Sequence, residues 1–477
     1  MMKDFDEQLF WATIPELNAK LKAREVSAVE LARAFGPRLE TLGRRYNALA
    51  LPFTEIAIRK AKEVDAELKR ERFRGPLQGV PYAAKDLLSV EGQITTWGAK
   101  PFAAQVFDHT ATVLTKLDKL GGLLMGKLAM VELAGGGGYN IAGASLFGPG
   151  LNPWNRSRWA GGSSSGSGAA VAAGLVPYAL GSETSGSILT PAAYCGVTGL
   201  RPTYGLVSRY GAMALSWTMD KVGPLARTVE DCALVLQAIA GKDPLDAASA
   251  GKSFYYVPDV VRKFSDLRIG FAPVDFAERP APNMRAVLAQ AFETMKALGI
   301  PMVEKKLPDF PYGAMTGAII GAEEASIFEQ FITSGQVDQL ADPDQIAGLK
   351  ARLDMPAKDY LKAMRMRSVM QREFHKLFSE VDILLAPTRY DVAPEISKPL
   401  DYRPPDAPKP PEDRGFSALI PAGNLAGLPA LSLPCGFADG LPVAIQLVGN
   451  PFSENTLIAI GKAFQARTDF HKQRPKG

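Results

Sequence analysis

The sequence predicts an α/β protein whose mixed sheet is largely buried. Stretches with apolar residues at three- and four-residue spacing alternate with short apolar runs, and glycine or proline bounds the runs. Such alternation is typical of helices that pack on the faces of a sheet. The fold class is therefore expected to be α/β, with a twisted mixed β-sheet covered by α-helices.

The expected elements can be placed in chain order. Residues 26–70 form charged helices, followed by an apolar strand in GVPYAAKD that carries Lys85 at its end. A helix over 110–120, a strand over 122–126, a short helix over 169–174 and a strand in GLVPYALGSE come next. The remainder alternates two short strands, LRIGFA and DILLAP, with helices over 227–240, 284–298, 357–379 and 453–466. The proline-rich segment 398–415 is expected to be an exposed loop.

Composition places the chain among folded globular proteins. It has 477 residues, of which 47% are hydrophobic and 22% charged, and 54 Lys and Arg face 50 Asp and Glu. The net charge of +4 is spread along the chain, so it favours neither a nucleic acid nor a membrane surface as partner. We expect one domain over 1–477, with a helical scaffold at about 1–70, a core at about 75–240 and variable segments at about 300–420.

Targeting signals and cysteine pairs are also not expected. We read no signal peptide and no run long enough to span a membrane. The three cysteines have no CxxC spacing, which favours neither a disulfide framework nor a thiolate zinc site. Cys195 is expected to be a buried packing residue. A reducing, cytoplasmic location fits this pattern.

Histidine is scarce, and this restricts the catalytic chemistry. His109 is expected in a turn or cap, His375 on a helix surface and His471 in a polar tail. None of these settings favours a catalytic imidazole. A hydrolase with this sequence would need a different base.

Two loops rich in serine and glycine are the candidate catalytic segments. GGSSSGSG at 161–168 and SETSGS at 182–187 flank a short helix and strand. A serine can attack a carbonyl if a neutral lysine accepts its proton, and burial would lower the pKa of Lys85 toward that state. From the local sequence alone, an ion pair between Lys85 and Asp86 is the more ordinary interpretation.

Other uses of the first loop fit less well. Phosphate binding would call for GK[ST] at a helix start or for GxGxxG, and neither occurs there. The GxSxG pattern around Ser164 matches a nucleophile elbow, but no buried apolar strand precedes it and no histidine partner is evident. A merely flexible loop stays open as an alternative.

The segment 160–205, AGGSSSGSGAAVAAGLVPYALGSETSGSILTPAAYCGVTGLRPTYG, strongly resembles the amidase signature family. GVPYAAKD, LFGPGLNPW, DKVGPLARTVEDC, VDILLAPT and LAGLPALSLPCGF extend the resemblance over most of the chain. It implies a large twisted mixed sheet with helices on both faces and hydrolysis of amide and related acyl bonds without a metal or organic cofactor. By position it implies a catalytic set of Lys85, Ser163 after a cis peptide bond, and the nucleophile Ser187.

The resemblance also implies an oxyanion hole formed by backbone N–H groups of Thr184, Ser185, Gly186 and Ser187. This sequence departs from the usual family pattern, because Ser165 and Ser185 replace glycines and Leu189 replaces an arginine. We therefore expect a less anionic, more apolar substrate site with a mobile wall at the glycine run 135–138. Candidate pocket residues are Met130, Gly137, Tyr139, Trp159 and Leu189, with core packing equally open for Met130 and Trp159.

The resemblance leaves three functions to weigh. The expected one is a free-standing serine amidohydrolase, a monomer or homodimer, acting on a small apolar or aryl amide, with esters and carbamates as further substrates. The alternative is the amidase (glutaminase) subunit of a glutamine-dependent tRNA amidotransferase, which passes ammonia to a partner. That subunit typically carries a glycine- and tyrosine-rich stretch, and residues 336–364 lack it. A catalytically dead binding protein is disfavoured because Lys85, Ser163 and Ser187 are all present.

Overall fold

A computed structural model describes residues 5–257, 262–405 and 409–476. Residues 406–408 of the proline-rich segment therefore lie outside the described residues. The parts of that segment on either side of the gap are mostly exposed and form neither helix nor strand. The long expected loop is thus observed where the chain can be described.

One large mixed sheet runs through the described part of the chain, as the sequence predicts. Its eleven strands lie in the order β1-β3-β2-β6-β8-β7-β12-β13-β11-β9-β10. The bounds are β1 Leu49–Pro52, β2 Pro81–Lys85, β3 Leu123–Leu128, β6 Tyr178–Glu183, β7 Thr198–Arg201, β8 Lys221–Ala226, β9 Ile269–Phe271, β10 Met302–Glu304, β11 Ile383–Pro387, β12 Ala430–Ala438 and β13 Leu441–Gly449. A separate pair comprises β4 Leu151–Asn152 and β5 Asn155–Trp159.

The sheet contains both parallel and antiparallel strand pairs, which confirms the mixed class. β2 is parallel to both β3 and β6, while β8 is antiparallel to β6 and β7. Every residue of β2 and β6 is buried, as expected for central strands covered on both faces. The rings of Tyr82 and Tyr178 stack at 5.2 Å between these two strands and help to fix their register.

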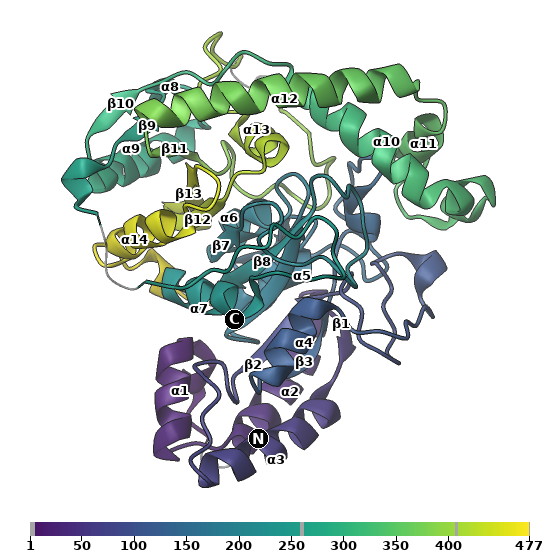
Figure 1. The fold of residues 1–477 in the computed structure, drawn as a ribbon, viewed down its shortest axis with the longest axis vertical. Helices are drawn as coiled ribbons and strands as arrows, with labels where there is room; N and C mark the ends of the chain where they lie inside the picture. Colours follow the sequence, from purple (N-terminus) through teal and green to yellow (C-terminus); the bar gives the residue numbers. More distant parts are fainter. Residues whose placement is uncertain (1–4, 258–261, 406–408, 477) are drawn as a thin grey trace.

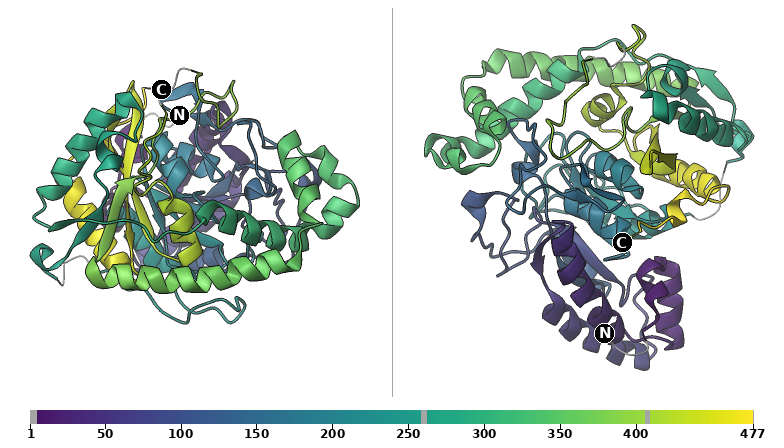
Figure 2. Two further views of the ribbon diagram at one scale, coloured as in Figure 1. Left: turned by 90° about the horizontal axis from the view of Figure 1, so that it is seen from above. Right: turned by 180° about the vertical axis from the view of Figure 1, so that it is seen from behind.

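Helices cover the sheet on both faces. α9 and α14 pack on one face of β12 and β13, and α6 packs on the other (Figure 2). α1–α3 lie at one end of the molecule and α10–α12 at the opposite end (Figure 1). The bounds are α1 Ile14–Ala23, α2 Ala28–Arg45, α3 Thr54–Lys69, α4 Thr112–Lys119, α5 Ser165–Ala172, α6 Leu189–Cys195, α7 Val229–Ile239, α8 Val274–Ala277, α9 Pro282–Lys296, α10 Tyr312–Thr333, α11 Pro343–Arg352, α12 Ala357–Glu380, α13 Leu419–Ala426 and α14 Glu454–Gln465.

The first helices begin where the sequence supplies side-chain caps. Thr13 and Glu16 form a capping box at the start of α1, and Ser27 and Glu30 do so at α2. The apolar faces of both helices contribute to the main hydrophobic core beside the central strands. Within the described ranges, no helix combines the length and apolar character that crossing a membrane would require.

Candidate active site

Lys85 ends β2 inside the protein, with a fully buried side chain. Its Nζ lies 2.7 Å from Ser163 Oγ and 2.9 Å from Ser182 Oγ. Burial lowers the Lys85 pKa to about 7, against an opposing effect of the Asp220 and Glu183 charges. A large fraction of this amine is therefore neutral near pH 7, and the neutral form can accept a proton.

Ser163 is presented by a close-packed loop ahead of α5. The peptide bond between Gly162 and Ser163 is cis, as the family resemblance implies, and the hydroxyl of Ser163 is fully buried. A Cβ added to Gly162 would lie 2.7 Å from the Trp159 ring and 2.8 Å from Val131. Only glycine leaves room there for the chain to bring Ser163 to Lys85.

Ser187 ends the turn that follows β6, and it is 8% exposed. Its carbonyl accepts a 3.3 Å hydrogen bond from the Ser164 N–H, so the two serine-rich loops are joined through their backbones. Within the described residues, the N–H groups of Ser185, Gly186 and Ser187 donate to no protein acceptor. Gly186 has a φ of 91°, a backbone conformation that favours glycine. Free N–H groups in a turn of this kind are able to hold an oxyanion.

The Glu183 carboxylate binds the two residues that follow this turn. Its Oε2 accepts hydrogen bonds from the N–H groups of Ile188 at 2.8 Å and Leu189 at 3.0 Å. Its Oε1 accepts from Arg201 Nη1 and Asn424 Nδ2, both at 2.8 Å. Burial alone would raise the pKa of Glu183, but Arg201 and these hydrogen bonds bring it below its ordinary value. The ionised carboxylate therefore holds both residues that follow the turn.

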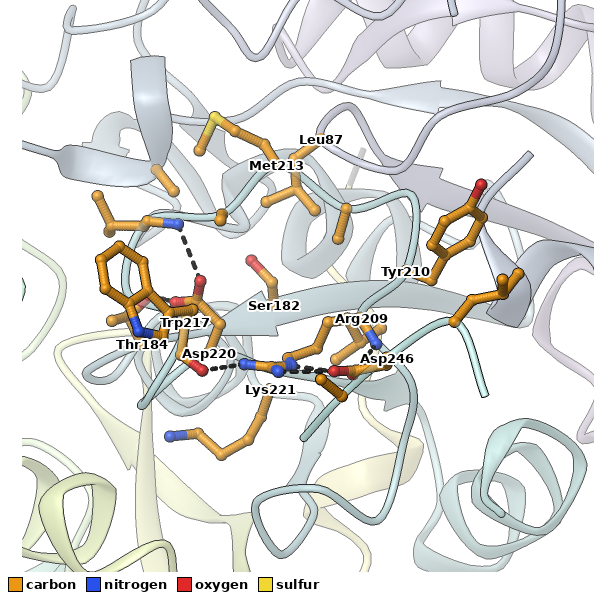
Figure 3. A pocket seen from close by; sticks show the side chains of 17 residues that line it. Leu87, Ser182, Thr184, Arg209, Tyr210, Met213, Trp217, Asp220, Lys221 and Asp246 are labelled. Carbon is orange, nitrogen blue, oxygen red and sulfur yellow. Dashed lines mark hydrogen bonds and ion pairs between the residues drawn. The ribbon is translucent and has the colours of Figure 1, made fainter. Parts of the chain in front are cut away.

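A small cavity of about 190 Å³ adjoins the other side of this turn, and Figure 3 shows the side chains that line it. Ser182, Thr184 and Asp220 are among them. The Thr184 hydroxyl donates to Asp220 at 2.6 Å, and the Asp220 carboxylate also accepts from the N–H groups of Leu215 and Ser216. Burial raises the pKa of Asp220. Thr184 is thus positioned by a partly buried carboxyl group.

Sequence reasoning missed Ser182, Glu183 and Asp220 as site residues. A sequence signal existed for Ser182 and Glu183, since they are polar residues closing the apolar strand YALGSE. Asp220 lies just before β8, the antiparallel neighbour of β6, so that its approach to Thr184 follows from strand pairing. No local pattern predicts this approach.

The five candidate pocket residues do not gather in one place. Tyr139 and Trp159 lie together, with ring centroids 6.0 Å apart, and the Tyr139 hydroxyl would be 3.0 Å from a Cβ on Gly162. Met130 and Leu189 are fully buried, and neither lines the cavity beside Thr184. Gly137 packs against α11, where a Cβ would lie 2.4 Å from the Gln345 carbonyl, and its N–H donates to Glu324. The glycine run is therefore held against the helices.

The imidazoles and thiols of the described residues form no hydrogen bond with Lys85, Ser163 or Ser187. His375 is exposed on α12, as expected, whereas His471 is half-buried and its carbonyl accepts from Arg227 at 3.2 Å. Cys195 is a buried free thiol, as predicted. Among the described residues, no group of three or more His, Cys, Asp or Glu side chains could hold a metal ion.

Known proteins resemble the chain over nearly its whole length. A glutamyl-tRNA(Gln) amidotransferase subunit of Carboxydothermus hydrogenoformans is 36% identical, covering 98% of this chain and 100% of that protein. A solved structure described as a vestigial protein complex that reveals the evolutionary origins of an s-triazine catabolic enzyme is 31% identical, with a TM-score of 0.86 over 98% and 100% of the two chains. The glutamyl-tRNA(Gln) amidotransferase subunit from Thermotoga maritima is 27% identical, with a TM-score of 0.76 over 97% and 96%.

These relatives correct two expectations. A free-standing enzyme for small apolar or aryl amides was expected, and this interpretation is wrong because full-length relatives are named as amidotransferase subunits. A monomer or homodimer without a nucleic-acid partner was also expected. This expectation is wrong on the same finding, because the names of these relatives describe a subunit of a larger enzyme and include glutamyl-tRNA(Gln). The lack of a glycine- and tyrosine-rich stretch therefore does not exclude such a subunit. Residues 336–364 form a 3₁₀ turn, α11 and the start of α12, and Figure 1 shows α11 at the opposite end of the molecule from β2.

The family itself rests on two concordant findings. The Amidase family matches residues 30–458, which include both serine-rich loops and Lys85. A native peptide amidase from Stenotrophomonas maltophilia shares the fold at 30% identity, with a TM-score of 0.81 over 98% of each chain. The chain belongs to the amidase signature family of hydrolases.

Proposed function

We propose that the chain is the amidase subunit of a glutamine-dependent amidotransferase that acts on glutamyl-tRNA(Gln). The observation that carries this proposal is the 36% identity to such a subunit over 98% of this chain and all of the other. The chain would hydrolyse the side-chain amide of glutamine, a non-peptide C–N bond. The ammonia released would pass to a partner subunit that amidates the tRNA-bound glutamate.

The proposed reaction uses Ser187 as nucleophile and Ser163 as proton relay. Neutral Lys85 accepts the proton of Ser163 Oγ while Ser163 takes the proton of Ser187 Oγ, and Ser187 attacks the amide carbon. Backbone N–H groups of the turn from Thr184 to Ser187 stabilise the oxyanion, each worth about 3 kcal/mol. The proton then returns through Ser163 to the leaving ammonia, and water hydrolyses the acyl-enzyme by the same relay.

Three features of the site support these roles. The 2.7 Å contact between Lys85 and Ser163 provides the first transfer, and burial keeps a share of the amine neutral. The hydrogen bond from the Ser164 N–H to the Ser187 carbonyl joins the two loops that carry Ser163 and Ser187. The N–H groups of Ser185, Gly186 and Ser187 donate to no protein acceptor among the described residues, so they are available to an oxyanion. We further propose that residues 1–477 act as one domain and that the protein works in the cytoplasm, where aminoacyl-tRNA is used.

The test uses the full chain, alone and together with its co-purified partner subunits. Formation of glutamate from glutamine is measured first, and then the ATP-dependent conversion of glutamyl-tRNA(Gln) to glutaminyl-tRNA(Gln). We expect both reactions in the assembled enzyme and neither in the Ser187→Ala variant. An assembly that binds charged tRNA but releases no ammonia from glutamine would refute the proposal.

A further inference from the structure

Lys221, the first residue of β8, is a buried lysine that the proposed reaction does not use. It is 2% exposed and lies directly opposite Glu183 in the antiparallel pair of β6 and β8. Successive side chains of a strand point to opposite faces, so Lys221 and Glu183 share the face that Ser182 does not use. Figure 3 shows the Lys221 side chain directed away from Ser182. The two buried amines are therefore on different faces of the sheet, because Lys85 contacts Ser182.

The amine of Lys221 has no hydrogen-bond partner in the part of the chain that the structure describes. The carboxylate opposite it is already occupied. Oε1 of Glu183 accepts from Arg201 and Asn424, and Oε2 accepts from two backbone N–H groups. Charged groups in protein interiors are normally paired. An ionised Lys221 would therefore need a counter-charge that the described residues do not supply.

Arg201 presents a second free donor on the same face. Its Nη1 donates to Glu183 at 2.8 Å and its Nε to the Leu428 carbonyl at 3.0 Å. Its Nη2 is buried and has no partner among the described residues. Burial lowers the pKa of Lys221 well below its ordinary value, and Arg201 is the charge that adds most to this effect. Two free cationic donors are thus neighbours in the interior.

Positive charge exceeds negative charge on this face. Arg367 of α12 is a third cation that acts on Lys221. Its three nitrogens donate to two carbonyls and one hydroxyl rather than to a carboxylate. Asp220 is next to Lys221 in the chain, so its side chain points to the opposite face of the strand. Glu183 is then the carboxylate that faces all three cations, and one negative charge does not balance them.

α13 covers these donors. Asn424 Nδ2 donates to Glu183 at 2.8 Å, and a Cβ on Gly423 would lie 2.7 Å from Arg201 Nη2. Glycine at position 423 therefore keeps a side chain away from the free donor. Lysine and arginine side chains offer donors and no acceptor, so the matching ligand only accepts hydrogen bonds. A halide ion has this property and is compact enough for an enclosed site.

We propose that Lys221 and Arg201 bind a small monovalent anion, chloride under ordinary conditions, on the face of the sheet that α13 covers. The anion accepts hydrogen bonds from Lys221 Nζ and Arg201 Nη2 and supplies the missing negative charge. The site is separate from Lys85, and it does not depend on the proposed function. Because Arg201 also binds the Glu183 carboxylate, the anion strengthens the support of the catalytic turn.

The first test follows thermal unfolding of the full chain while chloride is raised from about 1 mM to about 300 mM, with gluconate keeping the ionic strength constant. Wild type is compared with Lys221→Met and with the control Lys362→Met, which alters an exposed lysine of α12. Lys221→Met should fold, because an apolar side chain in place of a buried charged one is often neutral or stabilising. The second test locates bromide by anomalous scattering in crystals grown without chloride.

The unfolding midpoint of wild type and of Lys362→Met should rise by about 1 °C for each tenfold increase in chloride above the dissociation constant. The midpoint of Lys221→Met should not respond. Bromide should lie within hydrogen-bond distance of Lys221 Nζ and Arg201 Nη2. A chloride response that is equal in Lys221→Met and wild type would overturn the inference. If Lys221→Met does not fold, the position of bromide in wild type decides.

Water is the other occupant that these donors suit. A water molecule would also donate to Asn424 Oδ1, which has no partner within the described ranges. It would give neither an anomalous signal nor a chloride response. Bromide found at exposed side chains and not at Lys221 would be an adventitious ion only. Either result would refute the anion site.

Discussion

Acid should inactivate this enzyme through Lys85. Burial lowers the pKa of Lys85 to about 7, so the neutral amine makes up about 90% of the enzyme at pH 8 and about 10% at pH 6. If only the neutral form accepts the Ser163 proton, kcat/KM for glutamine should fall about tenfold between these pH values and about tenfold again by pH 5. A lysine with an ordinary pKa of about 10.4 would be neutral in fewer than about 1% of molecules at pH 8.

The assay is initial-rate ammonia release at saturating and limiting glutamine between pH 5 and pH 9. Glutamine has no group that titrates near pH 7, so the acid limb of kcat/KM belongs to the free enzyme. Burial and nearby cations lower the pKa of His471 to about 4, which removes it as the source of a limb near 7. A His109→Gln variant provides a matched control and should keep the limb. A rate that is flat from pH 5.5 to 8.5 would refute the neutral-lysine mechanism.

Five further substitutions test the described contacts. Ser187→Ala should abolish glutamine hydrolysis, and Ser163→Ala should reduce kcat by several orders of magnitude; near-normal initial rates in either would contradict the relay. Lys85→Met should unfold at a higher urea concentration than wild type at pH 7.5. The variant avoids the cost of neutralising the amine on folding, up to about 4 kcal/mol, and the two hydrogen bonds that it loses, about 1 kcal/mol each, cancel only part of this gain. A lower free energy of unfolding than wild type would show that the amine is not neutralised on folding. The cost is absent above the unfolded pKa, so the gain should shrink as pH rises toward 10. Glu183→Gln should lower the free energy of unfolding by about 3–5 kcal/mol, since Arg201 would lose its buried counter-ion; a urea midpoint equal to wild type would contradict this. Gly348→Ala should slow hydrolysis, because its Cβ would collide with the Gly137 carbonyl and displace the glycine run; unchanged kcat/KM would show that the run does not shape the site.

Much of the fold could be predicted because its signals are local. α7, α9, α12 and α14 begin and end within a few residues of the expected bounds, since each has a clear apolar face. α10 was not predicted, and its sequence contains Gly313, Gly317 and Gly321, which have low helix propensity. Gly321 has a packing role instead, because a Cβ there would lie 2.7 Å from the Arg352 side chain. Tertiary packing overrides propensity in this helix.

The β12–β13 hairpin shows a signal that was present but not used. Asp439 and Gly440 join the two strands, and both have positive φ, as the first and second positions of a type I′ turn require. The Asp-Gly pair between apolar runs could have predicted this hairpin. The segment was identified only as part of the family resemblance.

The site was predictable to the extent that it lies in short motifs. Lys85, Ser163 and Ser187 were placed by resemblance, whereas local sequence alone favoured an ordinary ion pair between Lys85 and Asp86. The structure gives Asp86 a different partner, Lys127 Nζ at 2.9 Å. Thr184 and Asp220 are 36 positions apart, and they meet because β8 pairs with β6. Contacts of this kind leave no local pattern.

The hydrogen bond between Asn424 and Glu183 also bears on when the turn that carries Ser187 becomes fully supported during synthesis. Asn424, which holds the Glu183 carboxylate, lies 241 positions further along the chain. A nascent polypeptide that has emerged only as far as Ser187 still lacks this contact. The support of the turn is therefore complete only after residue 424 has left the ribosome, when nearly the whole chain has been synthesised.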